Sequence, residues 1–205
     1  MSHKNPSFPA TPFGFLLVEG GDERAVCEAV AGPSTWSRLV CWNAQGRDQL
    51  ARLAAVAALD PNFQHARSVG VVLDMEDDGV VAHDIARRTL AALGAASAPA
   101  HGAFQGSAPR LGAFLSPDGV ANGCIETLCR KAVSDKKLAA CVDALVVCAG
   151  APHSVQAHAD KGWLRAYLGM CADPNLRFHQ ALMTSGGIDP AHAVFDPLRA
   201  FLQAL

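Results

Sequence analysis

Two patterns of apolar residues, one typical of buried strands and one of amphipathic helices, alternate along the first half of the chain. Continuous apolar runs at 13–18 and 69–73 are typical of strands buried on both faces, and 37–42 predicts a further short strand. Between them, apolar residues recur at spacings of three and four over 25–30 and 43–59, which predicts amphipathic helices. Because parallel strands are joined by helical crossovers, this order predicts an α/β fold with a mainly parallel sheet flanked by helices.

The second half of the chain has mostly helical patterns. A strand is expected at 111–115, with a short edge strand near 102–105. Helices are expected in five segments, at 80–93, at 123–133 with Asn122 as its cap, around 138–146, after Ser154 as its cap, and at 195–205. We therefore expect one domain over 1–205 with a helical C-terminal extension.

Composition narrows the class of protein. The chain has 205 residues, of which 50% are apolar and 18% are charged, as in a compact globular protein. The formal net charge is -2 and the pI is about 6.4, so the whole molecule has no excess positive charge to attract nucleic acid. A stand-alone nucleic-acid binder of high affinity is therefore not expected.

Seven cysteines are present, and none forms a C-x-x-C pair. Several lie in apolar runs, which favours small core residues in a reducing compartment over a zinc site or a disulfide framework. The first residues lack a signal-peptide pattern, and no apolar run is long enough to span a bilayer. We expect a cytoplasmic protein without a membrane partner.

An acidic group follows the strand at 69–73. The stretch VGVVLDMEDDG places Asp74, Glu76, Asp77 and Asp78 where the chain leaves the sheet. Ligands gather at the carboxyl ends of parallel strands, and crowded carboxylates need protons or a cation. Mg²⁺ prefers oxygen ligands, so a magnesium site is one interpretation. A solvated acidic turn that caps the next helix is the other.

A second acidic turn follows the first strand. In LLVEGGDE, Glu19 lies at the strand tip and Gly20-Gly21 allow a tight turn. Asp22 and Glu23 then fall in the first turn of a helix, where they could bind a metal ion or simply interact with the helix dipole.

Together, LLVEGGDE and VLDMEDD resemble the glutamate turn and the D-x-D element of the Toprim fold, which occurs in topoisomerases, primases and OLD-family nucleases. The resemblance implies that the single domain over 1–205 is Toprim-like and that Glu19 and Asp74 are metal-binding acids with a catalytic role. Glu76 stands where the pattern usually has Asp, so Asp77 or Asp78 could supply the second ligand instead.

Later stretches are similar to small stand-alone relatives of the OLD-type branch, through LGAFLSPDG, NGCIETL and DKGWLRAYL. This similarity implies that Glu126 is an added acidic ligand and that Lys161 is a catalytic cation near the reacting phosphate. An ordinary first-turn acid and an exposed lysine are the alternatives for these two residues. The metal-binding candidates are Glu19, Glu23, Asp74, Glu76, Asp78 and Glu126.

The function that the resemblance implies is phosphodiester hydrolysis on DNA or RNA, with Mg²⁺ or Mn²⁺ as cofactor. Because the chain is acidic, we expect a slow nuclease, a homodimer that builds its groove across two chains, or a subunit that works beside a partner ATPase. Two alternatives stay open. One is a catalytically weak, metal-binding regulatory module, and the other is a receiver-like or phosphatase-like protein in which Asp74 accepts a phosphoryl group. Walker A, G-x-S-x-G and H-E-x-x-H patterns do not occur.

Overall fold

The computed structural model describes residues 5–150, 156–171, 173, 177–182 and 187–205. A five-stranded sheet forms its centre, with strand order β2-β1-β3-β5-β4. The strands are β1 (Phe13–Val18), β2 (Leu39–Asn43), β3 (Ala66–Asp74), β4 (Phe104–Gln105) and β5 (Arg110–Ser116). Only β4, at one edge, runs antiparallel to its neighbour. The expected α/β fold with a mainly parallel sheet is confirmed.

Strand register brings the two acidic turns together. β1 lies between β2 and β3, and Val18 pairs with Asn43 on one side and with Val72 on the other. On the far side of β3, Asp74 pairs with Ser116 of β5. The chain segments that follow β1, β3 and β5 therefore leave the same edge of the sheet as neighbours.

Helices cover both faces of the sheet and extend past one of its ends. The α-helices are α1 (Gly21–Trp36), α2 (Leu50–Ala58), α3 (Gly79–Ala91), α4 (Ile125–Lys131), α5 (Lys136–Cys148), α6 (Gln156–Gly169), α7 (Phe178–Ala181) and α8 (Asp196–Gln203). In the described part of the chain, short 3₁₀ helices are η1 (Arg47–Gln49), η2 (Pro61–His65) and η3 (Ala193–Phe195).

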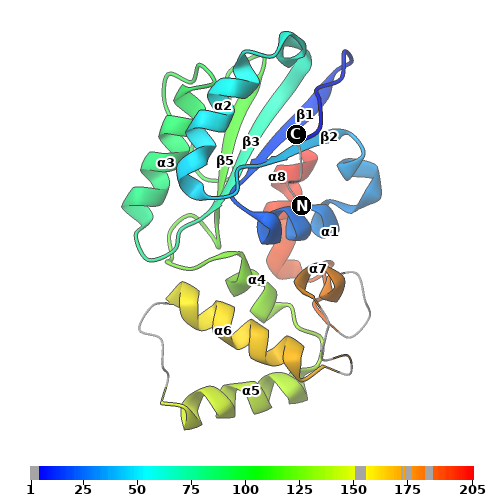
Figure 1. Cartoon of the computed structure of the whole chain (residues 1–205), viewed down its shortest axis with the longest axis vertical. Helices are drawn as coiled ribbons and strands as arrows, with labels where there is room; N and C mark the ends of the chain where they lie inside the picture. Colours follow the sequence, from blue (N-terminus) through cyan, green and yellow to red (C-terminus); the bar gives the residue numbers. More distant parts are fainter. Residues whose placement is uncertain (1–4, 151–155, 172, 174–176, 183–186) are drawn as a thin grey trace.

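Alternate residues of the strands pack into two separate hydrophobic cores, one on each face of the sheet. Phe15 and Leu17 pack with α2 and α3 on one face, whereas Leu16 and Val18 pack with α1 and α8 on the other. Beyond the carboxyl ends of the strands, α4, α5 and α6 form a helical layer (Figure 1). The buried residues of this layer continue the core that contains α1 and α8. Helix α6 therefore lies beyond the carboxyl ends of the strands.

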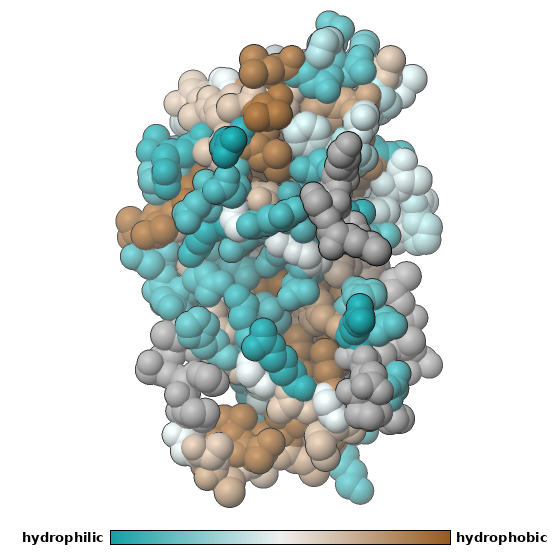
Figure 2. All heavy atoms as spheres, viewed as in Figure 1, coloured by the Kyte–Doolittle hydropathy of each residue, from teal (hydrophilic) through white to brown (hydrophobic). Residues whose placement is uncertain are grey.

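The outermost helix, α5, contributes little to that core. Val142 is its buried residue, while Leu145 and Val147 are exposed. Figure 2 shows apolar surface at this end of the molecule, where Figure 1 places α5. Among the described residues, none of the helices has the length and apolar character needed to cross a bilayer.

Two helix starts differ from the sequence prediction. The helix expected from residue 43 begins only at η1, because Gln45 and Gly46 have φ angles of 59° and 133° and interrupt it. Asn122 does not cap α4. Cys124 is the N-cap residue, and Thr127 accepts a hydrogen bond from its backbone N–H at 3.0 Å.

Other predicted elements agree with the structure. α5 and α6 lie where helices were expected, although Ser154 is outside the described residues. The C-terminal segment begins as η3 and continues as α8. Gly32 has a φ of 70° before Pro33 and kinks α1, and the helix expected over 25–30 continues past this kink to Trp36.

Candidate metal centre at the carboxyl ends of the strands

Four acidic side chains converge at the carboxyl edge of the sheet, and we call Glu19, Glu23, Asp74 and Glu126 the acidic cluster. Glu19 follows β1, Asp74 ends β3, and the other two lie in the first turns of α1 and α4. Glu23, Asp74 and Glu126 are only 7%, 1% and 6% exposed. All four are among the metal-binding candidates that the sequence predicts, and the fold brings them together.

Hydrogen bonds fix Asp74 at the centre of this arrangement. Its backbone N–H donates to Oε2 of Glu19 at 3.5 Å, and its Oδ1 accepts from the backbone N–H of Ile125 at 2.8 Å. Arg47 Nη2 donates to the Asp74 carbonyl oxygen at 3.0 Å. Asp74 thus joins the β1 exit, the N-terminus of α4 and the segment after β2.

Burial raises the carboxyl pKa values throughout the acidic cluster. The pKa of Glu23 rises to about 7, through burial and then through the charges of Glu19 and Glu126. The pKa of Asp74 is raised well above its usual range, again by burial first and then by the other three carboxylates, against the opposing charge of Lys161.

The other two members of the acidic cluster respond in the same direction. Burial raises the pKa of Glu19, and the charge of Arg47 only partly offsets this. Burial also raises the pKa of Glu126, and a hydrogen bond from Cys124 is the largest opposing effect. At neutral pH the acidic cluster therefore binds protons or a cation in preference to remaining fully ionised.

The donor set is suited to a hard cation. Oε2 of Glu126 is buried without a hydrogen-bond partner. Ligand atoms of Asp74, Cys124 and Glu126 all lie within 4.8 Å of one another. Burial raises the pKa of the Cys124 thiol, which keeps it protonated and leaves the carboxylate oxygens as the available ligands.

Lys161 of α6 supplies a positive charge beside the acidic cluster. Its Nζ lies 2.8 Å from Oε1 of Glu76 and 3.9 Å from Oδ2 of Asp74. Partial burial lowers the pKa of Lys161, but the hydrogen bond to Glu76 and the charges of Glu126 and Asp74 outweigh it, so the net shift is upward. The lysine is therefore a permanent cation at neutral pH.

Glu76 is held in an unusual backbone conformation. Its φ is 52°, in the left-handed region that glycine favours, and its backbone exchanges hydrogen bonds of 2.7 and 2.9 Å with Gly123. This geometry places its carboxylate against Lys161. Such strain persists where surrounding structure fixes it, and it is common at functional sites.

Asp77 and Asp78 have different surroundings. Oδ1 of Asp78 accepts from the backbone N–H groups of Val80 and Val81 at 3.0 and 3.2 Å, so this carboxylate caps α3. The Asp77 carbonyl oxygen accepts from Nδ2 of Asn122 at 2.9 Å. For Asp78 the helix-capping interpretation describes the observed contacts, whereas Asp74 and Glu76 point to the site.

A hollow of about 270 Å³ opens beside the acidic cluster, and we call it the carboxyl-end hollow. It is lined by Glu19, Gly20, Gly21, Asp22, Glu23, Gly46, Glu126, Lys161 and Arg165. Arg47 and Arg165 are not among the candidate residues predicted from the sequence. The available signals were weak, since Arg47 merely follows a strand and a Gly turn, and Arg165 lies one helical turn after Lys161.

A polar network connects α4 to α6 behind the site. Asp160 is 1% exposed; its carboxylate accepts from Oγ1 of Thr127 at 2.6 Å and from Nη1 of Arg130 at 3.0 Å. Thr127 is adjacent to Glu126 and Asp160 is adjacent to Lys161. The network therefore fixes the acid on α4 relative to the cation on α6.

A family model described as "Protein of unknown function (DUF3226)" matches residues 14–205, and the chain belongs to this family. The match spans every element that carries a side chain of the acidic cluster. Neither the curated proteins nor the solved structures contain a significant match.

Proposed function

We propose that the acidic cluster is the centre of a metal-dependent phosphodiester hydrolase that acts on nucleic acid. The observation that carries this proposal is the convergence of Glu19, Asp74 and Glu126 beside Lys161. Buried carboxylates with raised pKa values and an adjacent fixed cation suit phosphoryl transfer, which depends mainly on positioning and on stabilising negative charge.

We extend the proposal to a Toprim-like site of the OLD type. In support, the glutamate turn and the D-x-E element follow hydrogen-bonded parallel strands, β1 and β3. Glu126 and Lys161, which the resemblance also implies, face the same pair of strand exits. Glu76 departs from the D-x-D pattern, and its carboxylate is engaged by Lys161.

Glu19, Asp74 and Glu126 would hold a Mg²⁺ or Mn²⁺ ion, with Glu23 completing the set. When bound, such an ion would polarise the phosphate and lower the pKa of a water molecule. Arg47 keeps the exit of β3 in place through the Asp74 carbonyl oxygen. Lys161 offers N–H donors that can stabilise negative charge on phosphate oxygens in the transition state.

Substrate capture is the demanding step for this chain. With a formal net charge of -2, the whole protein lacks long-range attraction for a polyanion. We propose that capture uses a second copy of the chain or a partner ATPase, and that cleavage by the isolated protein is fastest at low salt.

The test uses purified protein with labelled single-stranded and duplex DNA and RNA, in Mn²⁺ or Mg²⁺ at low ionic strength. Cleavage is expected, and Glu19→Ala, Asp74→Ala and Lys161→Ala should each reduce its rate. If no substrate is cleaved, or if Asp74→Ala cleaves as fast as the wild type, the hydrolase proposal is wrong.

A regulatory module that binds metal without turnover is the second candidate. The contact between Lys161 and Glu76 favours it, because this lysine already neutralises part of the site. Thermal stabilisation by Mn²⁺ with no cleavage of any nucleic acid would support this module. A phosphoacceptor role for Asp74 fits less well, since a side chain 1% exposed is poorly placed for attack by a phosphoryl donor.

A further inference from the structure

The charged groups of the carboxyl-end hollow are unevenly matched. Besides Glu76, five acidic side chains of the described residues line the carboxyl-end hollow or lie next to it. They are Glu19, Asp22, Glu23, Asp74 and Glu126. The basic side chains are Lys161 and Arg165 in its lining and Arg47 beside Asp74. A strand of nucleic acid entering this hollow would be repelled unless specific cations faced its phosphates.

Two of these three basic side chains already have protein partners. Lys161 is hydrogen-bonded to Glu76 at 2.8 Å, and Arg47 donates to the Asp74 carbonyl oxygen at 3.0 Å. Arg165 is exposed, and no hydrogen bond, ion pair or ring contact joins it to any described residue. Its guanidinium therefore remains available to an external ligand.

The helix N-terminus in the hollow does not offer an alternative anion site. α1 begins at Gly21, but the Glu23 carboxylate lies over that end and accepts a hydrogen bond from its own backbone N–H. A Cβ atom at Gly20 would lie only 2.8 Å from Oε2 of Glu23. A phosphate placed there would meet this carboxylate, so the anion must bind on the α6 side.

We propose that Arg165 contacts a non-bridging phosphate oxygen of the nucleic-acid strand, one helical turn from Lys161. This inference rests on the proposed function and assigns the backbone-binding residue of the same site. Residues four apart lie on one helix face, so α6 presents both Lys161, near Asp74, and the exposed Arg165 to the hollow. The planar guanidinium can donate two parallel hydrogen bonds to one phosphate.

Because Arg165 would contact a phosphate beside the scissile one, its loss should weaken substrate binding more than it slows the chemical step. Arg165→Gln should raise KM about tenfold and leave kcat within about threefold of the wild type. On single-stranded substrate, the slope of log affinity against log salt should fall by about 0.7, the value for one lost phosphate contact. Arg165→Lys should recover part of the affinity, because it keeps the charge and loses the forked geometry.

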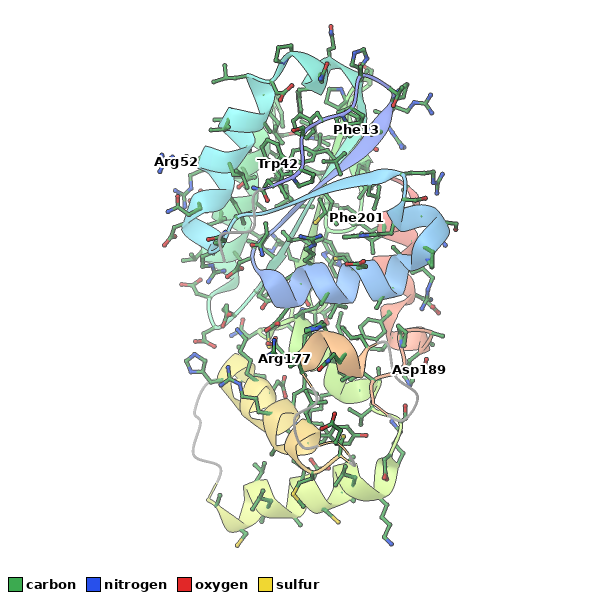
Figure 3. All side chains as sticks on the ribbon, turned by 45° about the vertical axis from the view of Figure 1, so that its right-hand side comes forward. Phe13, Trp42, Arg52, Arg177, Asp189 and Phe201 are labelled. Atoms are coloured by element: carbon green, nitrogen blue, oxygen red, sulfur yellow. The ribbon has the colours of Figure 1, made fainter. Side chains whose placement is uncertain are left out.

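Arg52→Gln is the matched control. Arg52 is exposed on α2 and projects away from α6 in Figure 3. Arg52→Gln removes the same charge as Arg165→Gln, so an effect of net charge alone would appear equally in both variants. Equal effects of Arg52→Gln and Arg165→Gln on KM and on the salt slope would overturn the assignment of Arg165.

A binding measurement separates this inference from the hydrolase proposal. Fluorescence anisotropy with a labelled single-stranded DNA oligonucleotide, in Ca²⁺ at low salt, should show about tenfold weaker binding by Arg165→Gln than by wild type. If wild type binds in Ca²⁺ but cleaves no substrate in Mn²⁺ or Mg²⁺, and Arg165→Gln binds more weakly, the hydrolase proposal fails and the Arg165 contact stands. If wild type does not bind, or Arg165→Gln binds equally well, the Arg165 contact is wrong.

Discussion

At the amino end of the sheet, a hollow of about 390 Å³ lies among Phe13, Gly14, Leu39 and neighbouring residues, with Arg38 and Arg67 in its lining. The carboxyl-end hollow is smaller, at about 270 Å³. No acidic side chain lines the amino-end hollow among the described residues, and both arginines are exposed. At the carboxyl end, acids are buried and lie close together.

The difference shows why hollow size is a poor guide to chemistry in this protein. Exposed arginines at the amino end are solvated by water and cost little free energy. Buried carboxylates at the carboxyl end have raised pKa values, so they favour binding of protons or a cation. We expect substitutions at the two ends to have correspondingly different effects on cleavage, stability and metal binding.

The largest expected effect is on cleavage. Glu19→Ala and Asp74→Ala should each lower the rate by at least about 100-fold, because each removes a carboxylate that holds the ion. The double variant should lose little more than either single variant, since the two acids act as one unit. Arg67→Gln at the amino end is the control and should cleave at the wild-type rate. Additive losses in a rate assay would contradict a shared ion.

The next effect is on the pH dependence of stability without metal. Burial, with Glu19 and Glu126, raises the pKa of Glu23 from 4.5 to about 7, so the folded state binds more protons than the unfolded state between these values. This contribution is fully present below about pH 4.5 and is lost as pH rises through about 7. Glu23→Gln should therefore raise the free energy of unfolding at pH 8 by on the order of 2–3 kcal/mol.

Urea unfolding in a chelator at pH 4.5 and pH 8 measures this difference. Glu28→Gln is the matched control, because Glu28 is exposed on the same helix. A stabilisation by Glu23→Gln that is equal at both pH values would show that its cause is not the ionisation of Glu23.

Two glycines provide a paired test of the ends. A Cβ at Gly14, at the amino end, would lie 2.8 Å from the Leu205 carbonyl oxygen and 2.7 Å from Cδ2 of Leu39. Gly14→Ala should cost about 1–3 kcal/mol of stability without changing the rate of cleavage by the folded protein.

Gly20→Ala should show the reverse pattern. The nearest atom to its Cβ is Oε2 of Glu23, at the end of a flexible side chain that can move away. Stability should change by less than about 1 kcal/mol, while displacement of Glu23 should weaken Mn²⁺ binding. Thermal unfolding and Mn²⁺ titration of both variants measure the two effects. Gly14→Ala should lose stability and Gly20→Ala should lose metal affinity, and equal losses of both in the two variants would contradict this expectation.

A modest effect is expected from Asp160→Asn. Asn keeps the shape of Asp160 and can accept from Arg130 or Thr127, but it removes the charge that faces Arg130. Stability should fall by about 1 kcal/mol, since the Arg130 side chain is 36% exposed and water screens the pair. kcat should fall more than KM rises if the network positions Lys161. If kcat is unchanged in the folded variant, the network of Thr127, Arg130 and Asp160 stabilises the fold and does not position Lys161.

Strand patterns were sufficient to predict that Glu19 and Asp74 would lie at neighbouring strand ends. The apolar runs before Glu19 and Asp74 predicted parallel strands, and the exits of parallel neighbours share one edge. Glu126 and Lys161 came from the resemblance alone. Periodicity could not place them, because it does not specify how α4 and α6 pack against the strand ends.

Local choices were less predictable. Asp78 and Asp74 have the same side chain, and only the backbone path decides that one caps α3 and the other is buried. Cys124 replaces the better capping residue Asn122, because the bridge between Gly123 and Glu76 fixes the chain before α4 begins. Arg47 and Arg165 lacked a sequence signal, since their roles depend on contacts distant in the chain.

Equilibrium binding of Mn²⁺ tests the central claim most directly, because it asks whether the acidic cluster is a cation site without requiring turnover. Calorimetric titration of wild type and of Asp74→Asn near pH 6.5, in two buffers with different ionisation enthalpies, reports both affinity and proton release. We predict saturable binding with release of protons in wild type, since Glu23 has a pKa of about 7, and loss of binding in Asp74→Asn. Absence of binding at millimolar Mn²⁺, or equal binding by Asp74→Asn, would contradict the account.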